Sequence, residues 1–512
     1  MSVQSIPFRA RSPFQIIEAR EWLPDLHDPD NPGLVSVRNA YPDLQGYSGV
    51  KSLVEEENAV GSTPNVAYFG RDSDGGVHTF VGASSGVYSL ETDGTWVAQS
   101  TIAEGASGIS QWAFTQFGNQ IIALTLTQDP IAVDLDDIPT LTAPYFSDLG
   151  GSPPRASLIS VVRDFIVLGG IENHPHRVQW SGHNNATAWT PSGITQSGLQ
   201  DLKSSNGRVQ ALVSGDRGLI FQERAVNRMT YVGPGLIFQF DVIERSHGTL
   251  APDSVCWFGD QVFYYSTQGF YKIVGDEDGI PIGQDKVDMW VRDNLVNLRD
   301  IRGTVDPVNK TVYWSAHLDN PDEYDIILVY RWDIQKWGLI RVNHLFLATD
   351  LSRGANLDST ELGDYYDDSI DNPVRQLSLD SPQWQTGSAG LYAFTANKKR
   401  ASFEGDYMAA ALETGYRQLS PDYTEVFIRQ LRPIVNKSNL VGQDAITVTT
   451  RESLIGGIAR AKTALIRENG RCDIRAPYGR YGSFTMHIGA GTRWDGFAGF
   501  TIESGNSGKR RS

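Results

Sequence analysis

The chain has 512 residues, of which 40% are hydrophobic and 20% charged, a composition typical of a folded protein that can bury a core without disulfides. Its 51 glycines, 24 prolines and many aromatics (12 Trp, 20 Tyr and 21 Phe) favour short strands joined by tight turns and exclude a coiled coil or a helical bundle. The net charge of −16, taken as a diffuse excess of acid, argues against sequence-specific nucleic-acid binding, which needs a basic surface.

The cysteines and the apolar runs bear on the cellular compartment. Cys256 and Cys472 are too few and too far apart for a disulfide framework or a zinc cluster, so we expect two buried, reduced thiols. No stretch reaches the roughly 18 apolar residues that cross a bilayer, and the N-terminus lacks the apolar core of a signal peptide. A soluble, unexported protein without stable membrane insertion is therefore expected.

Residues 1–65 predict an extended N-terminal arm. Prolines recur about every ten residues, at Pro7, Pro13, Pro24, Pro32 and Pro42. Proline breaks helices and favours an extended path, so this segment should not form a core of its own. We expect it to lie along the body of the protein or to reach a neighbouring subunit.

Residues 66–349 predict a β-propeller-like body. The runs VAYFG, VHTFVGA, VYSLE and TWVAQ, separated by Gly, Asp and Ser turns, indicate four consecutive antiparallel strands, the size of one propeller blade. Similar units follow, although a pair of β-sandwiches is an alternative and the sequence does not fix the number of blades. One helix is predicted over 284–300, where apolar residues recur at helical spacing, and it should pack against the rim of a sheet.

Residues 350–390 predict an acidic loop insertion. Eight acids lie between residues 350 and 385, against only Arg353 and Arg375, and a loop of this length is either functional or mobile. From 391 to 512, strands resume as a C-terminal antiparallel β-rich region, which either completes the propeller or forms a platform. The predicted fold class is therefore all-β.

A search for catalytic and metal-binding motifs gives no enzyme assignment. The phosphate-binding GxxxxGK, the HExxH, the GxSxG and the CxxC motifs are absent. His174 and His176 indicate loop histidines rather than a metal pair, and Asp72 and Asp74 indicate a solvated hairpin turn rather than a calcium loop. The segment 90–96, LETDGTW, partly resembles the turn-stabilising Asp-box of sialidase-type propellers. We therefore expect a non-enzymatic protein with no catalytic residue, no metal and no cofactor.

Three groups of residues carry a resemblance to a known family. The first is an N-x-Y-P…G-Y phrase formed by Asn39, Tyr41, Pro42, Gly46 and Tyr47. The second is a W-S…W phrase followed by a strand pair, formed by Trp180, Ser181, Trp189, Phe221, Glu223, Met229, Tyr231 and Gly233. The third is formed by Leu412, Glu413, Thr414 and Gly415. Together they resemble the tail hub, or nozzle, proteins of short-tailed double-stranded DNA bacteriophages, also called tail tubular protein B and packaged-DNA stabilisation or head-completion proteins.

The resemblance implies a structural virion protein of the phage tail, assembled in the host cytoplasm. Its implied form is a homo-hexameric ring below the portal and adaptor (head–tail connector) proteins, in contact with tail fibre, spike or needle proteins. Such a ring would extend the DNA channel, retain the packaged genome and allow its ejection, without sequence-specific DNA binding.

An acidic channel wall would repel the DNA phosphates over roughly 8 Å at physiological salt and so ease their passage. The acidic loop supplies the candidate pore-lining residues Asp364, Asp367, Asp368 and Asp371, and the alternative for this loop is a solvated position on the outside.

Candidate subunit contacts are the arm aromatics Phe8, Phe14, Trp22 and Tyr41, because obligate ring interfaces favour aromatic anchors. The alternative is that these side chains pack within their own chain. The alternative function is a receptor- or carbohydrate-binding tail spike or lectin-like β protein, and a propeller hydrolase comes third. Symmetry separates the first two, since spikes are usually trimeric and the hub is six-fold.

Overall fold

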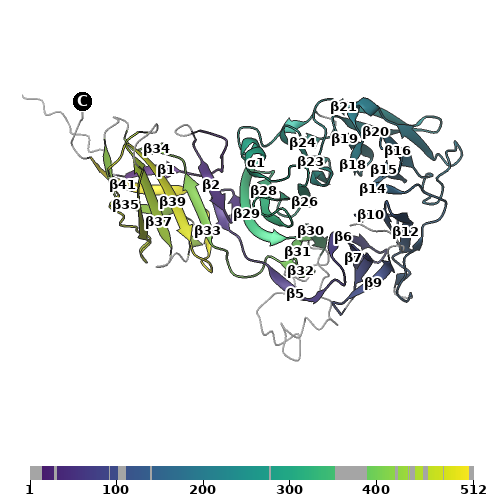
Figure 1. Ribbon diagram of the computed structural model, residues 1–512, viewed down its shortest axis with the longest axis horizontal. Helices are drawn as coiled ribbons and strands as arrows, with labels where there is room; N and C mark the ends of the chain where they lie inside the picture. Colours follow the sequence, from purple (N-terminus) through teal and green to yellow (C-terminus); the bar gives the residue numbers. More distant parts are fainter. Residues whose placement is uncertain are drawn as a thin grey trace, which may run out of the picture.

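The structure is a computed structural model that describes residues 14–27, 31–91, 93–101, 111–138, 141–275, 278–351, 389–420, 425–435, 437–438, 444–453, 459–476 and 478–506. Figure 1 shows two units along the longest axis, a ring of sheets and a flatter pair of sheets. The ring is a β-propeller and the pair of sheets is a β-sandwich, so the all-β fold class predicted from the sequence is confirmed.

The propeller consists, within the described residues, of seven consecutive antiparallel sheets. The first two are β6 (Pro64–Arg71), β7 (Val77–Ala83), β8 (Gly86–Leu90) and β9 (Trp96–Thr101), then β10 (Ala113–Phe117), β11 (Gln120–Thr125), β12 (Gln128–Asp134) and β13 (Ser147–Asp148). The third and fourth are β14 (Ala156–Val162), β15 (Phe165–Ile171), β16 (Arg177–Trp180) and β17 (Gly198–Asp201), then β18 (Val209–Val213), β19 (Arg217–Gln222), β20 (Val226–Gly233) and β21 (Ile237–Glu244).

The fifth sheet is β22 (Cys256–Phe258), β23 (Gln261–Ser266), β24 (Gly269–Val274) and β25 (Ile280–Pro281). The sixth is β26 (Arg302–Asp306), β27 (Thr311–Ala316), β28 (Tyr324–Arg331) and β29 (Lys336–His344), extended by β3 (Ala40–Asp43) and β4 (Gly46–Gly49). The seventh is β30 (Phe346–Leu351), β31 (Ala389–Phe394), β32 (Lys399–Ser402) and β5 (Val54–Ala59).

The ring closes by pairing strands from its two ends. The first strands of the sheets lie innermost, where β6 contacts both β10 and β30. The last sheet takes its outermost strand, β5, from the segment before the first sheet, with Lys399 opposite Ala59 and Ser402 opposite Val54. Backbone hydrogen bonds between the start and the end of the propeller therefore hold the ring shut.

The sandwich has two main sheets. One is β1 (Phe14–Glu18), β41 (Gly499–Asn506) and β35 (Val426–Ile434). The other is β2 (Leu34–Arg38), β33 (Ala410–Thr414), β39 (Tyr481–Ile488), β37 (Ala445–Arg451) and β38 (Arg460–Leu465), with β34 (Arg417–Gln418) also paired to β39. A two-stranded pair, β36 (Lys437–Ser438) and β40 (Trp494–Asp495), completes the unit. The core between the sheets includes Leu412, Phe484 and Phe500, all fully buried.

The N-terminal segment differs from the predicted arm. Its described residues supply β1 and β2 to the sandwich and β3, β4 and β5 to the propeller. In the described part of the segment the chain is extended, as its prolines favour, and its strands complete sheets of the same chain. The segment therefore ties the two units together.

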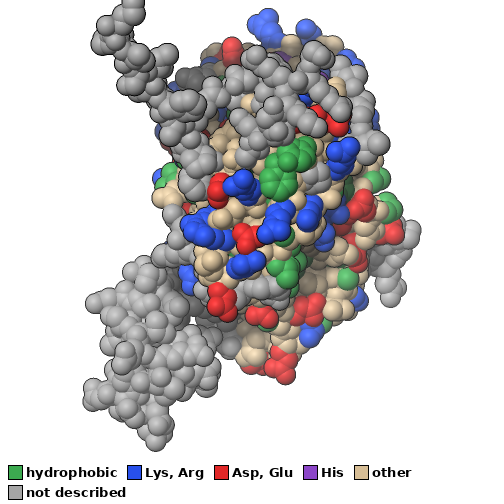
Figure 2. All heavy atoms as spheres, turned by 90° about the vertical axis from the view of Figure 1, so that its left-hand side faces the viewer, with side chains coloured by type: hydrophobic (Ala, Val, Ile, Leu, Met, Phe, Trp, Pro, Cys, Tyr) green, Lys and Arg blue, Asp and Glu red, His purple; other side chains and the backbone are tan. Residues whose placement is uncertain are grey.

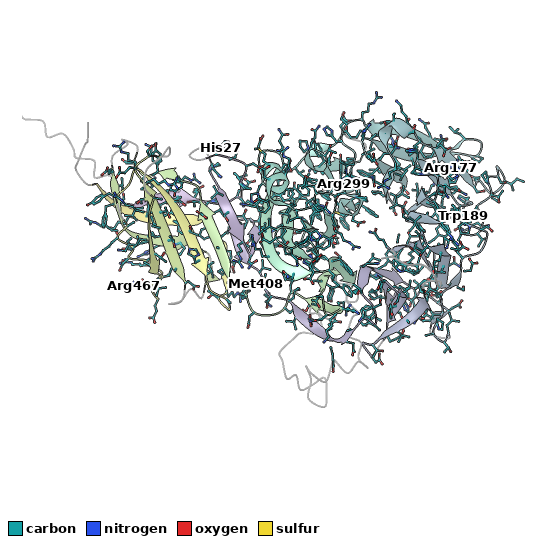
Figure 3. All side chains as sticks on the ribbon, in the orientation of Figure 1. His27, Arg177, Trp189, Arg299, Met408 and Arg467 are labelled. Carbon is teal, nitrogen blue, oxygen red and sulfur yellow. The ribbon has the colours of Figure 1, made fainter. Side chains whose placement is uncertain are left out.

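The boundaries after residue 349 also differ from the prediction. Residues 389–402 complete the seventh sheet of the propeller, and residues 410–506 form the sandwich with the two N-terminal strands. Figure 3 labels Met408, where the chain crosses between the units, and its backbone N–H donates to the Val50 carbonyl at 2.8 Å. Most of the predicted acidic loop lies outside the described residues.

The predicted helix is present but shorter. In the described part of the chain, α1 spans Asp288–Asn294, and two short 3-10 turns lie at Ser204–Asn206 and Pro252–Ser254. Val287, Val291 and Leu295 point into the core, in agreement with their helical spacing. The two cysteines are buried and free, and burial raises the pKa of the Cys472 thiol to about 11.

Candidate functional site

The junction between the two units is one candidate site, and Tyr47 lies at its centre. The Tyr47 side chain is completely buried. Its hydroxyl accepts a hydrogen bond from the Trp22 backbone N–H at 2.6 Å and donates to the Trp337 carbonyl at 2.7 Å. Its backbone exchanges two hydrogen bonds with Phe497 of the sandwich, at 3.0 and 2.8 Å. One residue thus connects the N-terminal segment, the sixth sheet of the propeller and the sandwich.

Two neighbours of Tyr47 need special backbone conformations. Gly46 has φ +149°, and a Cβ atom there would lie 1.7 Å from the Phe497 carbonyl oxygen, so only glycine allows this close approach. Asn39 has φ 55°, and its side chain donates to the Ala409 carbonyl at 2.8 Å and accepts from the Arg341 backbone N–H at 2.7 Å. The N-x-Y-P…G-Y phrase of the sequence therefore encodes the junction.

The same junction fixes the helix. The Asp25 carboxylate accepts hydrogen bonds from the backbone N–H groups of Met289 and Trp290, each at 2.8 Å, and so caps the first turn of α1. The Trp22 and Trp290 rings meet edge to face, with centroids 5.2 Å apart. A cavity of 410 Å³ lies beside them, between α1, β2 and β29.

A second cavity, of 810 Å³, lies at the propeller axis and is lined by residues of β6, β10, β14, β18 and β26. Its polar side chains are largely engaged with each other or with neighbours. Gln111 donates to the Asp253 carboxylate at 2.8 Å, and the Arg208 guanidinium lies 3.7 Å from Glu223. Arg302 donates to the Asn65 carbonyl and lies over the Phe346 ring, 4.9 Å from its centroid.

Two carboxylates, Glu172 and Asp253, belong to the described lining of the axis cavity. Two groups with strongly shifted pKa values, Asp288 and His344, are absent from its lining. Burial raises the pKa of Asp288 to about 7 and lowers the pKa of His344 to about 4. His344 Nδ1 donates to the Val342 carbonyl, so Nε2 of the neutral ring accepts from the Ser315 hydroxyl at 2.7 Å. Both groups serve the packing of the propeller.

In the described part of the chain, no group of three or more His, Cys, Asp or Glu side chains could hold a metal ion. His176 Nδ1 lies 3.0 Å from the Gly207 carbonyl oxygen, a loop contact. Asp72 accepts from the Gly76 backbone N–H at 2.6 Å and stabilises its hairpin turn. Across the same residues, no helix is long and apolar enough to cross a bilayer.

The predicted subunit contacts have different outcomes. Trp22 is only 1% exposed and packs in the core of its own chain, which agrees with the alternative that this side chain packs within its own chain. Tyr41 is partly buried and its hydroxyl forms a 2.6 Å hydrogen bond with the Thr311 hydroxyl, again within the chain. Phe14 begins β1, opposite Glu503 of β41. Phe8 and the candidate pore-lining residues Asp364, Asp367, Asp368 and Asp371 lie outside the described residues.

The other phrases of the resemblance encode packing within sheets. The Trp180 indole donates to the Gln196 carbonyl at 2.9 Å, and Tyr231 donates to the Gln196 side chain at 2.7 Å. Phe221 and Met229 are completely buried. The Thr414 hydroxyl accepts from the Phe484 backbone N–H at 3.0 Å in the sandwich. These contacts hold strands of the two units together.

The distribution of charge is a feature that whole-chain composition missed. Residues 1–409 contain 29 lysines and arginines against 51 acids, whereas residues 410–512 contain fifteen against nine. The excess of acid is therefore not diffuse, since residues 1–409 carry all of it. Figure 2 shows the result as a gathering of Lys and Arg side chains on the end of the sandwich. Counting charge by segment would have found this signal.

No family model matches the chain, and no curated protein matches it. The similar solved structures include a chain of the mitotic checkpoint complex (11% identity, TM-score 0.41, 70% of this chain and 95% of that chain). BamB from Moraxella catarrhalis is similar at 11% identity and TM-score 0.36, over 76% of this chain and 98% of that one. The Pan2 WD40 domain of Neurospora crassa is similar at 8% identity and TM-score 0.37, over 59% and 90%. Similarity at this level identifies no function.

Proposed function

We propose that this chain is a structural subunit of the tail hub, or nozzle, of a short-tailed double-stranded DNA bacteriophage. Six copies form a ring below the portal and adaptor proteins, which extends the DNA channel, retains the packaged genome and lets it pass at infection. The subunit makes and breaks no covalent bond. The resemblance of the three sequence phrases supplies the assembly and its place in the virion.

The observation that carries the proposal is the single core shared by the two units. Buried residues of the N-terminal segment, the propeller and the sandwich form one cluster, which includes Trp22, Tyr47, Trp337, Phe484 and Phe500. Such a core makes the propeller and the sandwich one body rather than two hinged domains. A ring that holds a pressurised genome needs rigid subunits of this kind.

The axis cavity supports a passive role. The engaged side chains around it, such as Gln111 with Asp253, serve the propeller as internal links. A hydrolase would need two carboxylates about 5–10 Å apart with one pKa raised. Of the two carboxylates in the described lining, Glu172 and Asp253, the second accepts the Gln111 hydrogen bond, and Asp288, whose pKa is raised, is not part of the lining.

Sedimentation and particle imaging of the purified protein test the proposal. Six chains of 56.4 kDa should form a ring of about 338 kDa with six-fold symmetry. A three-fold particle would favour the spike alternative, and a monomer at high concentration together with cleavage of polysaccharides would favour an enzyme. Either result would contradict the proposed function.

A further inference from the structure

Four exposed arginines lie on β35 of the sandwich and on the segment bridged to it. Arg429 and Arg432 lie on β35, and Arg471 and Arg475 lie on the neighbouring segment 471–476. The two segments run antiparallel, because Leu431 and Cys472 exchange two backbone hydrogen bonds and the Arg475 N–H donates to the Arg429 carbonyl. We call these four side chains the arginine face.

The alternation of burial directs all four side chains outward. Cys472, Ile474 and Ala476 are completely buried, whereas Arg471, Asp473 and Arg475 between them are exposed. On β35, Ile428 and Leu431 point inward and Arg429 and Arg432 are exposed. The four arginine side chains therefore project to the side of β35 and of the segment bridged to it that faces away from the core. Figure 2 views this end of the molecule, and Figure 3 labels Arg467 on the sandwich.

The four guanidinium groups have no ion-pair partner among the described residues. The one carboxylate between them, Asp473, pairs with Arg467 at 2.9 Å. Propeller arginines behave differently: Arg155 lies 2.8 Å from Asp129, and Arg177 lies 2.7 Å from Asp201. The arginine face is thus a local excess of positive charge whose donors are available to a ligand.

We propose that the arginine face binds the phosphate backbone of duplex DNA without sequence preference. Guanidinium groups donate in a planar fork that matches phosphate oxygens, and a row of them on an exposed sheet tracks a backbone without reading bases. The choice of DNA as the polyanion rests on the proposed function. In the proposed tail hub, the sandwich binds the DNA and the acidic propeller repels it. Retention of the genome and its passage would then depend on different units.

The test is fluorescence anisotropy of a labelled 30-base-pair duplex titrated with the full-length protein. Wild type should bind with a log–log salt slope of about −3.6, since each neutralised phosphate contributes about −0.9. The variant R429Q/R432Q/R471Q/R475Q should bind at least about tenfold more weakly at low salt. The matched control R155Q/R163Q/R177Q/R341Q loses the same charge from the propeller and should bind like wild type. Lys509, Arg510 and Arg511, outside the described residues, stay unchanged in both.

Three results would overturn the inference. Wild type could fail to bind the duplex at low salt, or both variants could lose affinity equally, which would make net charge the cause. The sandwich variant could also change the sedimentation coefficient while the control does not, which would make the face a contact with a second copy of the chain. Because ring symmetry is measured without DNA, failure of this inference is distinguishable from failure of the proposed function.

Discussion

The propeller and the sandwich differ in how their exposed arginines are paired with carboxylates. Residues 1–409, which contain the propeller, are strongly acidic, and several propeller arginines pair with nearby carboxylates, as in Arg177 with Asp201 and Arg400 with Glu56, both at 2.7 Å. Residues 410–512, which supply most of the sandwich, carry more arginine and lysine than acid, and the arginine face has no carboxylate partners in the described residues. Paired charges stabilise a surface only slightly, whereas unpaired charges of one sign create a field that selects a partner. The two units therefore differ in role while sharing one core.

The largest expected effect comes from breaking that shared core. Trp22→Ala removes a buried indole that contacts both the sandwich and α1, so the free energy of unfolding should fall by about 3–5 kcal/mol. Urea denaturation followed by tryptophan fluorescence measures this loss. Trp257, which is 38% exposed on β22, provides the control, and Trp257→Ala should cost far less. Equal losses in the two variants would refute the role of Trp22 at the junction.

A smaller loss of stability should follow when only the hydrogen bonds of the Tyr47 hydroxyl are removed. Tyr47→Phe keeps the ring but leaves the Trp22 N–H and the Trp337 carbonyl without their partner, at a cost of about 1–3 kcal/mol. Tyr478→Phe removes a hydroxyl from a 45% exposed side chain on the sandwich and should be nearly neutral. Thermal unfolding compares the pair. A neutral Tyr47→Phe would show that the hydroxyl does not join the units.

The free energy of unfolding should depend on pH through two groups of the propeller, Asp288 and His344, whose effects have opposite signs. The folded-state pKa of Asp288 is about 7, above its ordinary value of about 4, so this group lowers stability as pH rises between those values. The folded-state pKa of His344 is about 4, below its ordinary value of about 6.5, so this group lowers stability as pH falls through that window. The two contributions partly cancel in wild type.

Asp288→Asn removes the Asp288 contribution and leaves that of His344. The amide oxygen can still accept from the Phe270 N–H, so at pH 8 the variant should be more stable than wild type by on the order of 1 kcal/mol. Its stability should rise steadily from pH 4 to pH 7, which denaturant midpoints across that range would measure. A variant with the same pH profile as wild type would contradict the shifted pKa.

The smallest effect should come from the surface arginines. R429Q/R432Q/R471Q/R475Q removes side chains without ion-pair partners among the described residues, so the melting temperature should change by less than about 1 °C. R155Q/R163Q/R177Q/R341Q breaks exposed ion pairs and should lower it by about 2 °C at most. A large destabilisation by the first variant would mean that the arginine face serves the fold rather than a ligand.

The sequence predicted the strands better than their partners. Local alternation and turn residues identify the strands of the first sheet, 64–101, because they depend on neighbours in the chain. Pairings such as β5 with β32 and β1 with β41 join residues hundreds of positions apart, and no local signal specifies them. The N-terminal segment therefore resembles a free arm in sequence although its strands complete both units.

The residues of the junction were also only partly predictable, because their roles depend on residues far away in the chain. Tyr47 and Gly46 stood out as a phrase, but their role at the junction depends on Phe497, some 450 residues away in the chain. The aromatic Trp22 fits a subunit contact and a core residue equally well until its surroundings are known. The net charge of −16 for the whole chain concealed the arginine face, because the acids of residues 1–409 outweigh the basic excess of residues 410–512.

Imaging of intact virions, with the chain located by its propeller and sandwich, tests the central claim most directly. The account predicts six copies around the axis of the DNA below the portal, each with both units in the fixed arrangement that the shared core imposes. Copies placed off that axis, three-fold symmetry, or a propeller and sandwich that vary in relative orientation would contradict it.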